Sequence, residues 1–279
     1  MEPLLAAALD ALGVEDTPRP LTPHHTHAWR VGDWRVRTAT DRTRARPLHH
    51  EAHAVALLYA HGLYPVAGAH GHVGDGLWTA VEWRPGRTLW EWCAPARASG
   101  GACFAPRLAE FADRAFDTLA RLHAAGWRHG DIQPMNIVIT ATGAVEFIDH
   151  DLTHHRDLLP LRDPYRGGMD HFTAPEVARR RLDTESDVDI ELTDVAEVYS
   201  LGASIRAAWT GTDPATDRTA GRYVTPADVL EDVATGRRRT PLAAERPWAD
   251  PDLEALIEAT MDPDPTARVR HLAALPGIR

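Results

Sequence analysis

The alternation of apolar and polar residues predicts β-strands in the first part of the chain. Residues 34–38 read Trp-Arg-Val-Arg-Thr, so Arg35 and Arg37 alternate with Trp34, Val36 and Thr38. One face of this strand is therefore apolar, and the other has two guanidinium groups. Gly32-Asp33 precedes it and has the composition of a tight hairpin turn. Strands are expected at about 20–22, 28–31, 34–38 and 77–81, and helices at 4–12 and 48–61.

Apolar residues in the rest of the chain recur with helical spacing. Between residues 108 and 122 they lie three or four positions apart, which places them on one face of a helix. Residues 137–140 and 145–148 flank Ala141-Thr142-Gly143-Ala144 and predict a strand–turn–strand unit. Further helices are expected at about 194–209, 226–234 and 252–261. Loops or irregular segments are expected at 62–72, 97–102, 150–175 and 211–222.

The segment Glu82-Trp83-Arg84-Pro85-Gly86 contains residues that interrupt regular structure, and it marks the expected boundary. We expect a small strand-rich lobe over residues 1–85 and a larger helical lobe over residues 86–279. Together they would form one α+β domain with two lobes.

Composition narrows the functional classes. The chain has 279 residues, of which 44% are hydrophobic and 25% charged, and this is typical of a soluble globular protein. A net charge of −10 argues against a surface that coats nucleic acid or an anionic membrane. All 30 basic residues are arginine. The absence of lysine excludes a Schiff-base amine and a P-loop lysine.

Neither an exported protein nor a membrane protein is expected. Cys93 and Cys103 are too few for a structural zinc site, and nothing indicates an oxidising compartment. The first residues include Glu2 and lack the basic segment of a signal peptide. No apolar run approaches the roughly 20 residues of a membrane helix. The expected location is the cytoplasm.

Side chains that could take part in catalysis are most frequent between residues 127 and 151. Asp131 is followed five residues later by Asn136, and Asp149 comes after the expected strand–turn–strand unit. In-line phosphoryl transfer requires a carboxylate that orients the attacking hydroxyl and oxygen ligands for Mg²⁺. A catalytic loop with Asp and Asn at this spacing, followed by a second Asp, is a known solution to these requirements.

These residues resemble those of the protein-kinase-like superfamily. Asp131 corresponds to the catalytic-loop Asp, Asn136 to the metal-binding Asn and Asp149 to the Asp of the DFG motif. Further similarities are Ala174-Pro175-Glu176 (the APE motif), Asp194–Gly202 (the central helix of the C-lobe) and Asp262-Pro263-Asp264-Pro265 with Arg268. The resemblance implies that Glu176 and Arg268 form a structural ion pair.

The segment Thr26–Thr38 resembles the start of aminoglycoside and choline phosphotransferase-like kinases more than that of protein kinases. Arg37 occupies the position of the strand lysine that binds phosphate, and Glu51 on the following helix is its expected partner. A guanidinium can bind phosphate oxygens with two hydrogen bonds. Pro23-His24-His25-Thr26-His27 stands where a glycine-rich loop is usual. Arg35 is expected to point the same way as Arg37, near the adenine pocket, where a small residue is normal, and this argues against ordinary ATP binding.

Three further positions depart from the protein-kinase pattern. Gly130 replaces the Arg that receives an activation-loop phosphate. Gln133 replaces a Lys that steadies the γ-phosphate. His150-Asp151 replaces Phe-Gly.

The resemblance implies ATP and Mg²⁺ as cofactors. Asp131 would act as the general base, and Asn136 and Asp149 would hold Mg²⁺. Arg37, held by Glu51, would bind phosphate. The backbone groups of Glu82 and Trp83 would face the adenine edge.

Three functions are compatible with these residues. The first is phosphate transfer to Ser or Thr of a peptide or protein, for instance a natural-product precursor peptide from which a partner lyase then eliminates the phosphate. The second is an antibiotic or sugar kinase. The third is a pseudokinase that binds a peptide or partner enzyme without transferring phosphate. Roles without function also remain open: Arg37 as a surface arginine of the strand and Glu51 as a solvated helix residue.

Overall fold

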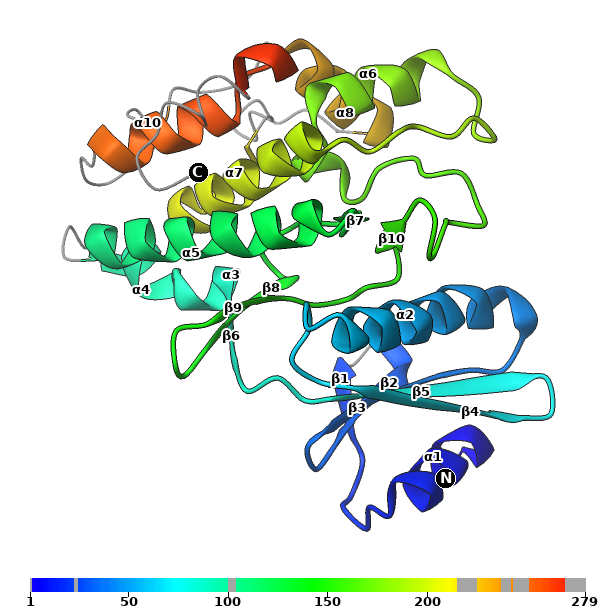
Figure 1. Cartoon of the computed structure of the whole chain (residues 1–279). Coiled ribbons are helices and arrows are strands. Elements are labelled where there is room, and N and C mark those ends of the chain that lie inside the picture. Colours follow the sequence, from blue (N-terminus) through cyan, green and yellow to red (C-terminus); the bar gives the residue numbers. More distant parts are fainter. Residues whose placement is uncertain are drawn as a thin grey trace. The chain divides into compact units, whose positions relative to one another are not determined.

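The computed structural model describes residues 2–22, 25–99, 104–214, 225–236, 242 and 251–268 (Figure 1). The chain forms two compact units. The first comprises Met1–Pro85 together with Asp149–Thr153, and the second comprises Gly86–Ile148 and His154–Arg279. The short segment Asp149–Thr153, which lies within the expected helical lobe by sequence, therefore belongs to the first unit.

The first unit contains a five-stranded sheet with the order β1-β2-β3-β5-β4. All neighbouring strands are antiparallel. The predicted hairpin turn is confirmed, because Val31 pairs with Trp34 and leaves Gly32-Asp33 as a two-residue turn, in which Gly32 has a φ of +56°. The strands are β1 (Arg19–Thr22), β2 (His25–Val31), β3 (Trp34–Ala39), β4 (Gly68–Val73) and β5 (Gly76–Glu82).

Two helices cover opposite faces of this sheet (Figure 1). Helix α1 (Pro3–Leu12) packs its leucines against one face, where Val36 and Trp78 are buried. Helix α2 (Arg42–Ala60) packs against the other face through Leu48, which meets Leu77 of β5. The alternation in β3 thus places Val36 toward α1 and the two arginines toward α2.

Two expectations for this unit differ from the structure. Helix α2 begins at Arg42, six residues earlier than predicted, because the Asp41 side chain accepts hydrogen bonds from the N–H groups of Thr43 and Arg44, each at 3.0 Å. The loop predicted at 62–72 is wrong for its second half. Residues 68–73 form β4, which pairs along its whole length with β5. Their Gly-Ala-His-Gly-His sequence has no apolar alternation, so the pairing with β5 determines this strand.

The second unit is mainly helical. Figure 1 shows α5, α7 and α10 lying beside one another, and α6 beside α8. The apolar stripe predicted between residues 108 and 122 is buried in α5. Helix α7 is buried along most of its length and forms the centre of this unit. The long helices are α5 (Ala105–Ala124), α6 (Pro175–Asp183), α7 (Asp194–Thr210), α8 (Pro226–Thr235) and α10 (Pro251–Thr260).

Short elements complete the second unit. The predicted strand–turn–strand unit is present as β8 (Ile137–Thr140) and β9 (Val145–Phe147), and β6 (Gly86–Thr88) joins its edge. The remaining short elements are α3 (Leu89–Trp92), α4 (Ala94–Ser99), the strand pair β7 (Trp127–Arg128) and β10 (His154–His155), and the 3-10 helix η2 (Asp170–Phe172). The elements that were not predicted are β6, α3, α4, β7, β10, η2 and α6. The loop predicted at 97–102 is wrong for residues 97–99, which belong to α4, and the irregular segment predicted at 150–175 contains β10 and η2. Cys103, residues 100–102 and residues 215–222 of the expected loops lie outside the described residues.

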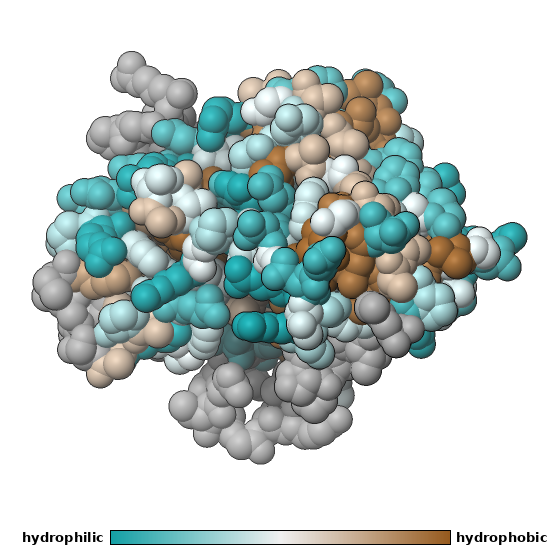
Figure 2. Space-filling model, turned by 90° about the horizontal axis from the view of Figure 1, so that it is seen from below, coloured by the Kyte–Doolittle hydropathy of each residue, from teal (hydrophilic) through white to brown (hydrophobic). Residues whose placement is uncertain are grey.

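The described part of the chain is thus an α+β protein with an antiparallel sheet first and helices after it. Its surface mixes hydrophilic and hydrophobic residues, as Figure 2 shows for one face. Among the described residues, no helix combines the length and the apolar character that a membrane span needs.

Candidate functional site

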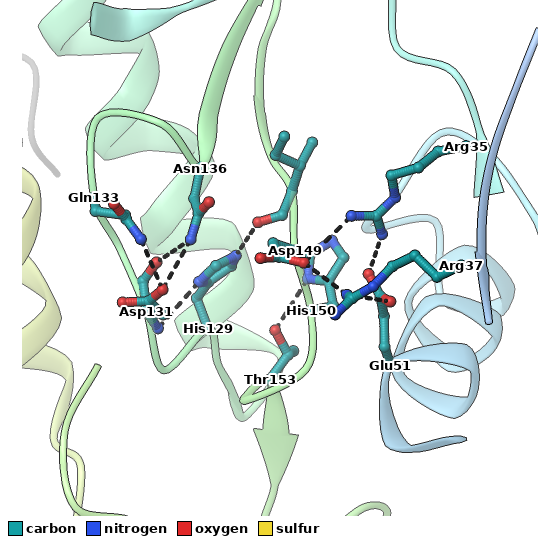
Figure 3. A network of polar contacts seen from close by, with 11 residues as sticks. Arg35, Arg37, Glu51, His129, Asp131, Gln133, Asn136, Asp149, His150 and Thr153 are labelled. Atoms are coloured by element: carbon teal, nitrogen blue, oxygen red, sulfur yellow. Dashed lines mark hydrogen bonds and ion pairs between the residues drawn. The ribbon is translucent and has the colours of Figure 1, made fainter. Parts of the chain in front are cut away.

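The first unit brings four charged side chains together, from β3, α2 and the segment Asp149–Thr153 (Figure 3). Arg37 Nη1 lies 2.9 Å from Glu51 Oε2 and 3.0 Å from Asp149 Oδ1. Arg35 bonds to the other carboxylate oxygen of Glu51, and its Nη1 lies 3.3 Å from Asp149 Oδ1. Each carboxylate therefore contacts both arginines. We name Arg35, Arg37, Glu51 and Asp149 the arginine–carboxylate cluster.

Burial strengthens the ion pairs of this cluster. The Glu51 side chain is completely buried, whereas 36% of the Asp149 side chain is exposed. Burial alone would lower the pKa of Arg35, but the negative charges of Glu51 and Asp149 outweigh it and raise the pKa above its ordinary value. Arg35 thus points the same way as Arg37, as the alternation in the strand predicts, and contacts the same two carboxylates, which were not predicted as its partners. Its place near the adenine pocket stays a prediction.

The backbone at Asp149 adopts a rare conformation. Its φ is +68°, and it is the one non-glycine residue with positive φ in the described part of the chain. Asp tolerates this left-handed conformation better than most residues. The following residues are anchored to the first unit, since His50 Nε2 donates to the Thr153 carbonyl at 2.7 Å and the buried His150 packs edge-on against Tyr64. Asp149 is therefore presented by a segment that is fixed at its far end.

The second unit holds the Asp131 carboxylate with three donors, and Figure 3 shows two of them, Gln133 and Asn136. Gln133 Nε2 and Asn136 Nδ2 each donate to Oδ2 at 3.0 Å. The N–H of Met169 donates to Oδ1 at 2.8 Å. Asn136 Nδ2 also donates to the Asp131 carbonyl, which turns its amide oxygen away from Asp131. The amide oxygen and the aspartate are ligand types that Mg²⁺ accepts.

His129 stabilises the backbone at Asp131 through hydrogen bonds of both ring nitrogens. Its Nε2 donates to the carbonyl of Ile148 at 3.1 Å, and its Nδ1 accepts the N–H of Asp131 at 3.3 Å. A protonated imidazole has no acceptor nitrogen, so this pair of bonds assigns the neutral ring with the proton on Nε2. The side chain is completely buried and fixes the backbone of the loop.

Gly168 and Met169 approach Asp131 closely. A Cβ atom at Gly168 would collide with the Asp131 carboxylate and lie 2.8 Å from the Gly130 carbonyl oxygen. Only glycine leaves room for this approach. The remaining cavity beside Asp131 has a volume of about 10 Å³, roughly the space of one water molecule. The carboxylate is thus oriented mainly by the chain itself.

Glu197 of α7 is a positioning residue that the sequence analysis missed. It is buried, its Oε1 accepts the N–H of Gly130 at 2.8 Å, and its Oε2 lies 2.8 Å from His123 Nε2. Burial raises the pKa of Glu197, but the bonds from His123 and Gly130 outweigh it, so the pKa is lowered. The sequence indicated it only by its place in the Asp194–Gly202 segment, where this charged residue stands between the apolar Ala196 and Val198.

Other predicted site residues are placed as follows. Glu82 pairs with Trp34 at the end of β5, and the Trp83 N–H donates to the Asp33 carbonyl at 2.6 Å. That N–H is therefore engaged within the first unit. Residues 23 and 24 lie outside the described part. No group of three or more His, Cys, Asp or Glu side chains there is already arranged to hold a metal ion.

Comparisons with known proteins point to kinases. No protein-family model matches the chain. The chain is 31% identical over 148 residues to proteins named serine/threonine-protein kinase PknA from Mycobacterium tuberculosis and Mycobacterium bovis. The match covers 53% of this chain and 30% of each relative, so the chain spans less than a third of their length. This distant similarity supports a relationship to the protein-kinase-like superfamily.

Proposed function

We propose that this protein is an ATP-dependent phosphotransferase with a two-lobed kinase-like fold, which transfers the γ-phosphate to a hydroxyl group. The observation that carries the proposal is the Asp131 carboxylate, held by Asn136, Gln133 and the Met169 N–H in the second unit. An aspartate fixed by three donors and followed by an asparagine suits the orientation of a substrate hydroxyl. The similarity to serine/threonine-protein kinases supports the same reaction. We propose the cytoplasm, where ATP is available, as the location of this reaction.

In the proposed reaction, Asp131 accepts the proton of the substrate hydroxyl. The hydroxyl oxygen forms a bond to the γ-phosphorus while the bond from that phosphorus to the bridging oxygen of ADP breaks. Bound Mg²⁺ supplies positive charge that neutralises the phosphate oxygens. Asn136 and Asp149 provide oxygen atoms of the type that would hold it. The neutral His129 keeps the backbone of Asp131 in place.

Arg37 replaces the lysine of the usual phosphate-binding strand. Its guanidinium keeps its charge under all ordinary conditions and offers two parallel N–H donors to phosphate. Glu51 holds both Arg37 and Arg35, so a second guanidinium lies at the same place. We propose that Arg37 binds phosphate and that Arg35 supports it from the same face of β3. Glu82 and Trp83 remain the proposed place of the adenine edge, through backbone groups other than the Trp83 N–H.

We propose Ser or Thr of a peptide or protein as the acceptor. The support is the segment from Ala174 to Glu176 and the printed name of the relatives. A natural-product precursor peptide, with a partner lyase that removes the phosphate, is the more specific form of this proposal.

One observation favours a second candidate, a pseudokinase. Asp149, the proposed metal ligand, is bonded to two arginines, and the positive charge of these side chains opposes a cation at its Oδ1. A protein that binds a peptide or partner without transfer could keep this arrangement permanently. The phosphotransferase requires that nucleotide and Mg²⁺ replace the contacts of the arginines to Asp149.

Transfer of radiolabelled phosphate from ATP separates these candidates. The wild type, Asp131→Asn and the control Asp157→Asn would be incubated with a Ser/Thr peptide library and, separately, with a panel of sugars and aminoglycosides. We expect labelled peptide with the wild type and the control, and a loss of at least a hundredfold with Asp131→Asn, which keeps the size of the side chain but cannot accept the proton. Label on small molecules alone would overturn the proposed acceptor. No transfer by the wild type, or equal transfer by Asp131→Asn, would overturn the reaction.

A further inference from the structure

Four histidines gather on the surface of the first unit, outside the arginine–carboxylate cluster. His49 and His53 lie one turn apart on α2, and His70 and His72 lie two residues apart on β4. The ring centroids of His49 and His53 are 4.3 Å apart. His70 lies 6.3 Å from His49 and 5.9 Å from His53, and His72 lies 6.5 Å from His49. We name these four residues the histidine cluster.

The register of the sheet places both strand histidines on the side that α2 covers. His72 pairs with Leu77 of β5, and Leu77 packs against Leu48 of α2. Directly paired residues of antiparallel strands share a face, so His72 lies on the α2 side, and His70 does too because side chains alternate. His70 and His72 are exposed, while His49 and His53 are half-buried. A solute ion can therefore reach the cluster.

Hydrogen bonding prepares His53 as a ligand. Its Nδ1 lies 2.8 Å from the carbonyl oxygen of His49. A carbonyl oxygen only accepts, so Nδ1 carries the proton and the neutral ring keeps its lone pair on Nε2. Histidines that bind metals commonly donate their second ring N–H to a backbone carbonyl in this way.

We propose that the histidine cluster binds a late first-row divalent cation such as Zn²⁺ through imidazole nitrogens from both α2 and β4. Imidazole is a preferred ligand of Zn²⁺, Ni²⁺ and Cu²⁺, whereas Mg²⁺ prefers oxygen. Two ligands one helical turn apart and two on alternate strand positions each lie on one face, so both pairs can reach the same ion.

Rotation of side chains is sufficient to form the site. The imidazoles are not gathered around one point as they stand, in keeping with the lack of a ready-made metal group among the described residues. With Zn–N bonds of about 2.0 Å in a tetrahedral site, the centroids of two bound rings lie about 5 Å apart. The observed separations of 4.3 to 6.5 Å span this value. The exposed His70 and His72 can turn without a change in the backbone.

Binding would join α2 to the edge strand of the sheet. Helix α2 also holds Glu51, so an ion at the histidine cluster would stabilise the element that positions Arg35 and Arg37. The proposal does not depend on phosphate transfer, because every residue it uses lies outside the proposed nucleotide and acceptor contacts.

Calorimetry on protein without a histidine tag, and without nucleotide, tests the proposal. Zn²⁺ and Ni²⁺ would be titrated into the wild type, His49→Gln/His53→Gln and His70→Gln/His72→Gln, with Mg²⁺ as the oxygen-preferring comparison. His61→Gln is the matched control, since His61 caps the C-terminal end of α2, directs its Nδ1 to the Leu57 carbonyl at 2.9 Å, and is outside the cluster. Circular dichroism would show that each variant is folded.

We expect one strongly bound Zn²⁺ per wild-type chain and at least tenfold weaker Zn²⁺ binding in each double variant. His61→Gln should bind Zn²⁺ as strongly as the wild type does, and Mg²⁺ should not bind to the histidine cluster. A rise in melting temperature with Zn²⁺ should disappear in His70→Gln/His72→Gln, whose substitutions are exposed. Absence of stoichiometric binding to the wild type, or binding by either double variant that is as strong as that of the wild type, would overturn the proposal.

Discussion

Arg268 and Glu176 form a bidentate ion pair across 92 residues of sequence, with N–O distances of 2.9 and 2.8 Å. The Arg268 side chain is completely buried and also donates to the carbonyls of Asp262 and Val195. It connects the beginning of α6 with the beginning of α7 and with the segment after α10. The resemblance of the APE segment and of the Asp262–Arg268 segment to those of kinases predicts this pair, and the structure confirms it.

Loss of this pair should destabilise the protein. Glu176→Ala leaves a fully buried guanidinium without its carboxylate, although its two carbonyl acceptors remain. We expect a decrease of about 1–3 kcal/mol in the free energy of unfolding. Chemical denaturation would measure it. Glu191→Ala is the control, because it removes an exposed pair with Arg156 and should change stability by less than about 1 kcal/mol. Equal effects of the two substitutions would contradict the structural role of the pair.

Glu51 should stabilise the first unit through both arginines. Glu51→Gln keeps the volume of the side chain but removes a buried negative charge that Arg35 and Arg37 share. Since both guanidiniums are partly exposed and can turn to solvent, we expect a loss of about 2 kcal/mol rather than the larger cost of a fully buried pair. A double-mutant cycle of Glu51→Gln with Arg37→Gln would measure the coupling. Asp75→Asn, which breaks only the exposed pair with Arg42, serves as the control. A coupling energy of zero would show that Arg37 is not held by Glu51.

The lowered pKa of Glu197 predicts an acid-dependent contribution to stability. A carboxyl group whose pKa is lower in the folded protein than in the unfolded chain stabilises the fold above its ordinary pKa. That contribution is lost as the pH falls through the lowered folded value. Glu197→Gln cannot ionise but keeps an oxygen for the Gly130 N–H. We therefore expect the wild type to exceed Glu197→Gln in stability at pH 6, and the difference to shrink as the pH falls below about 4. Denaturation at several pH values measures this, and a difference that is independent of pH would disagree with the proposed ionisation.

The regular parts of the fold were predictable because their residues show their burial. The β2–β3 hairpin, the strand–turn–strand unit and the stripe of α5 all have clear apolar periodicity. Strand β4 was not predictable in this way, since four of its six residues are exposed and its pairing partner determines it. Helix α6 was missed because Pro175 at its start and three consecutive arginines give no apolar stripe.

Contacts in the candidate site were predictable for those residues that match a family motif. Asp131 and Asn136 are hydrogen-bonded to each other, and Arg37 forms an ion pair with Glu51. Arg35 lies two residues before Arg37, and the alternation predicted that both arginines share one face of the strand. Its contacts to Glu51 and Asp149 were not predicted, because these residues lie 16 and 114 positions away in the sequence. Glu197 was missed because its role depends on a contact to the Gly130 backbone, 67 residues away.

Calorimetry of ATP binding with and without Mg²⁺ tests the proposed phosphotransferase most directly, through Asp149. Asp149→Asn is preferred to Asp149→Ala, because Asn tolerates the φ of +68° at this position while Ala does not. Asp75→Asn is the control for the loss of an exposed charge in the same unit. We predict that the wild type and the control bind ATP only with Mg²⁺, and that Asp149→Asn weakens this binding at least tenfold. Failure of the wild type to bind, or unchanged affinity in Asp149→Asn, would contradict the assignment of Asp149 as the metal ligand and favour the pseudokinase.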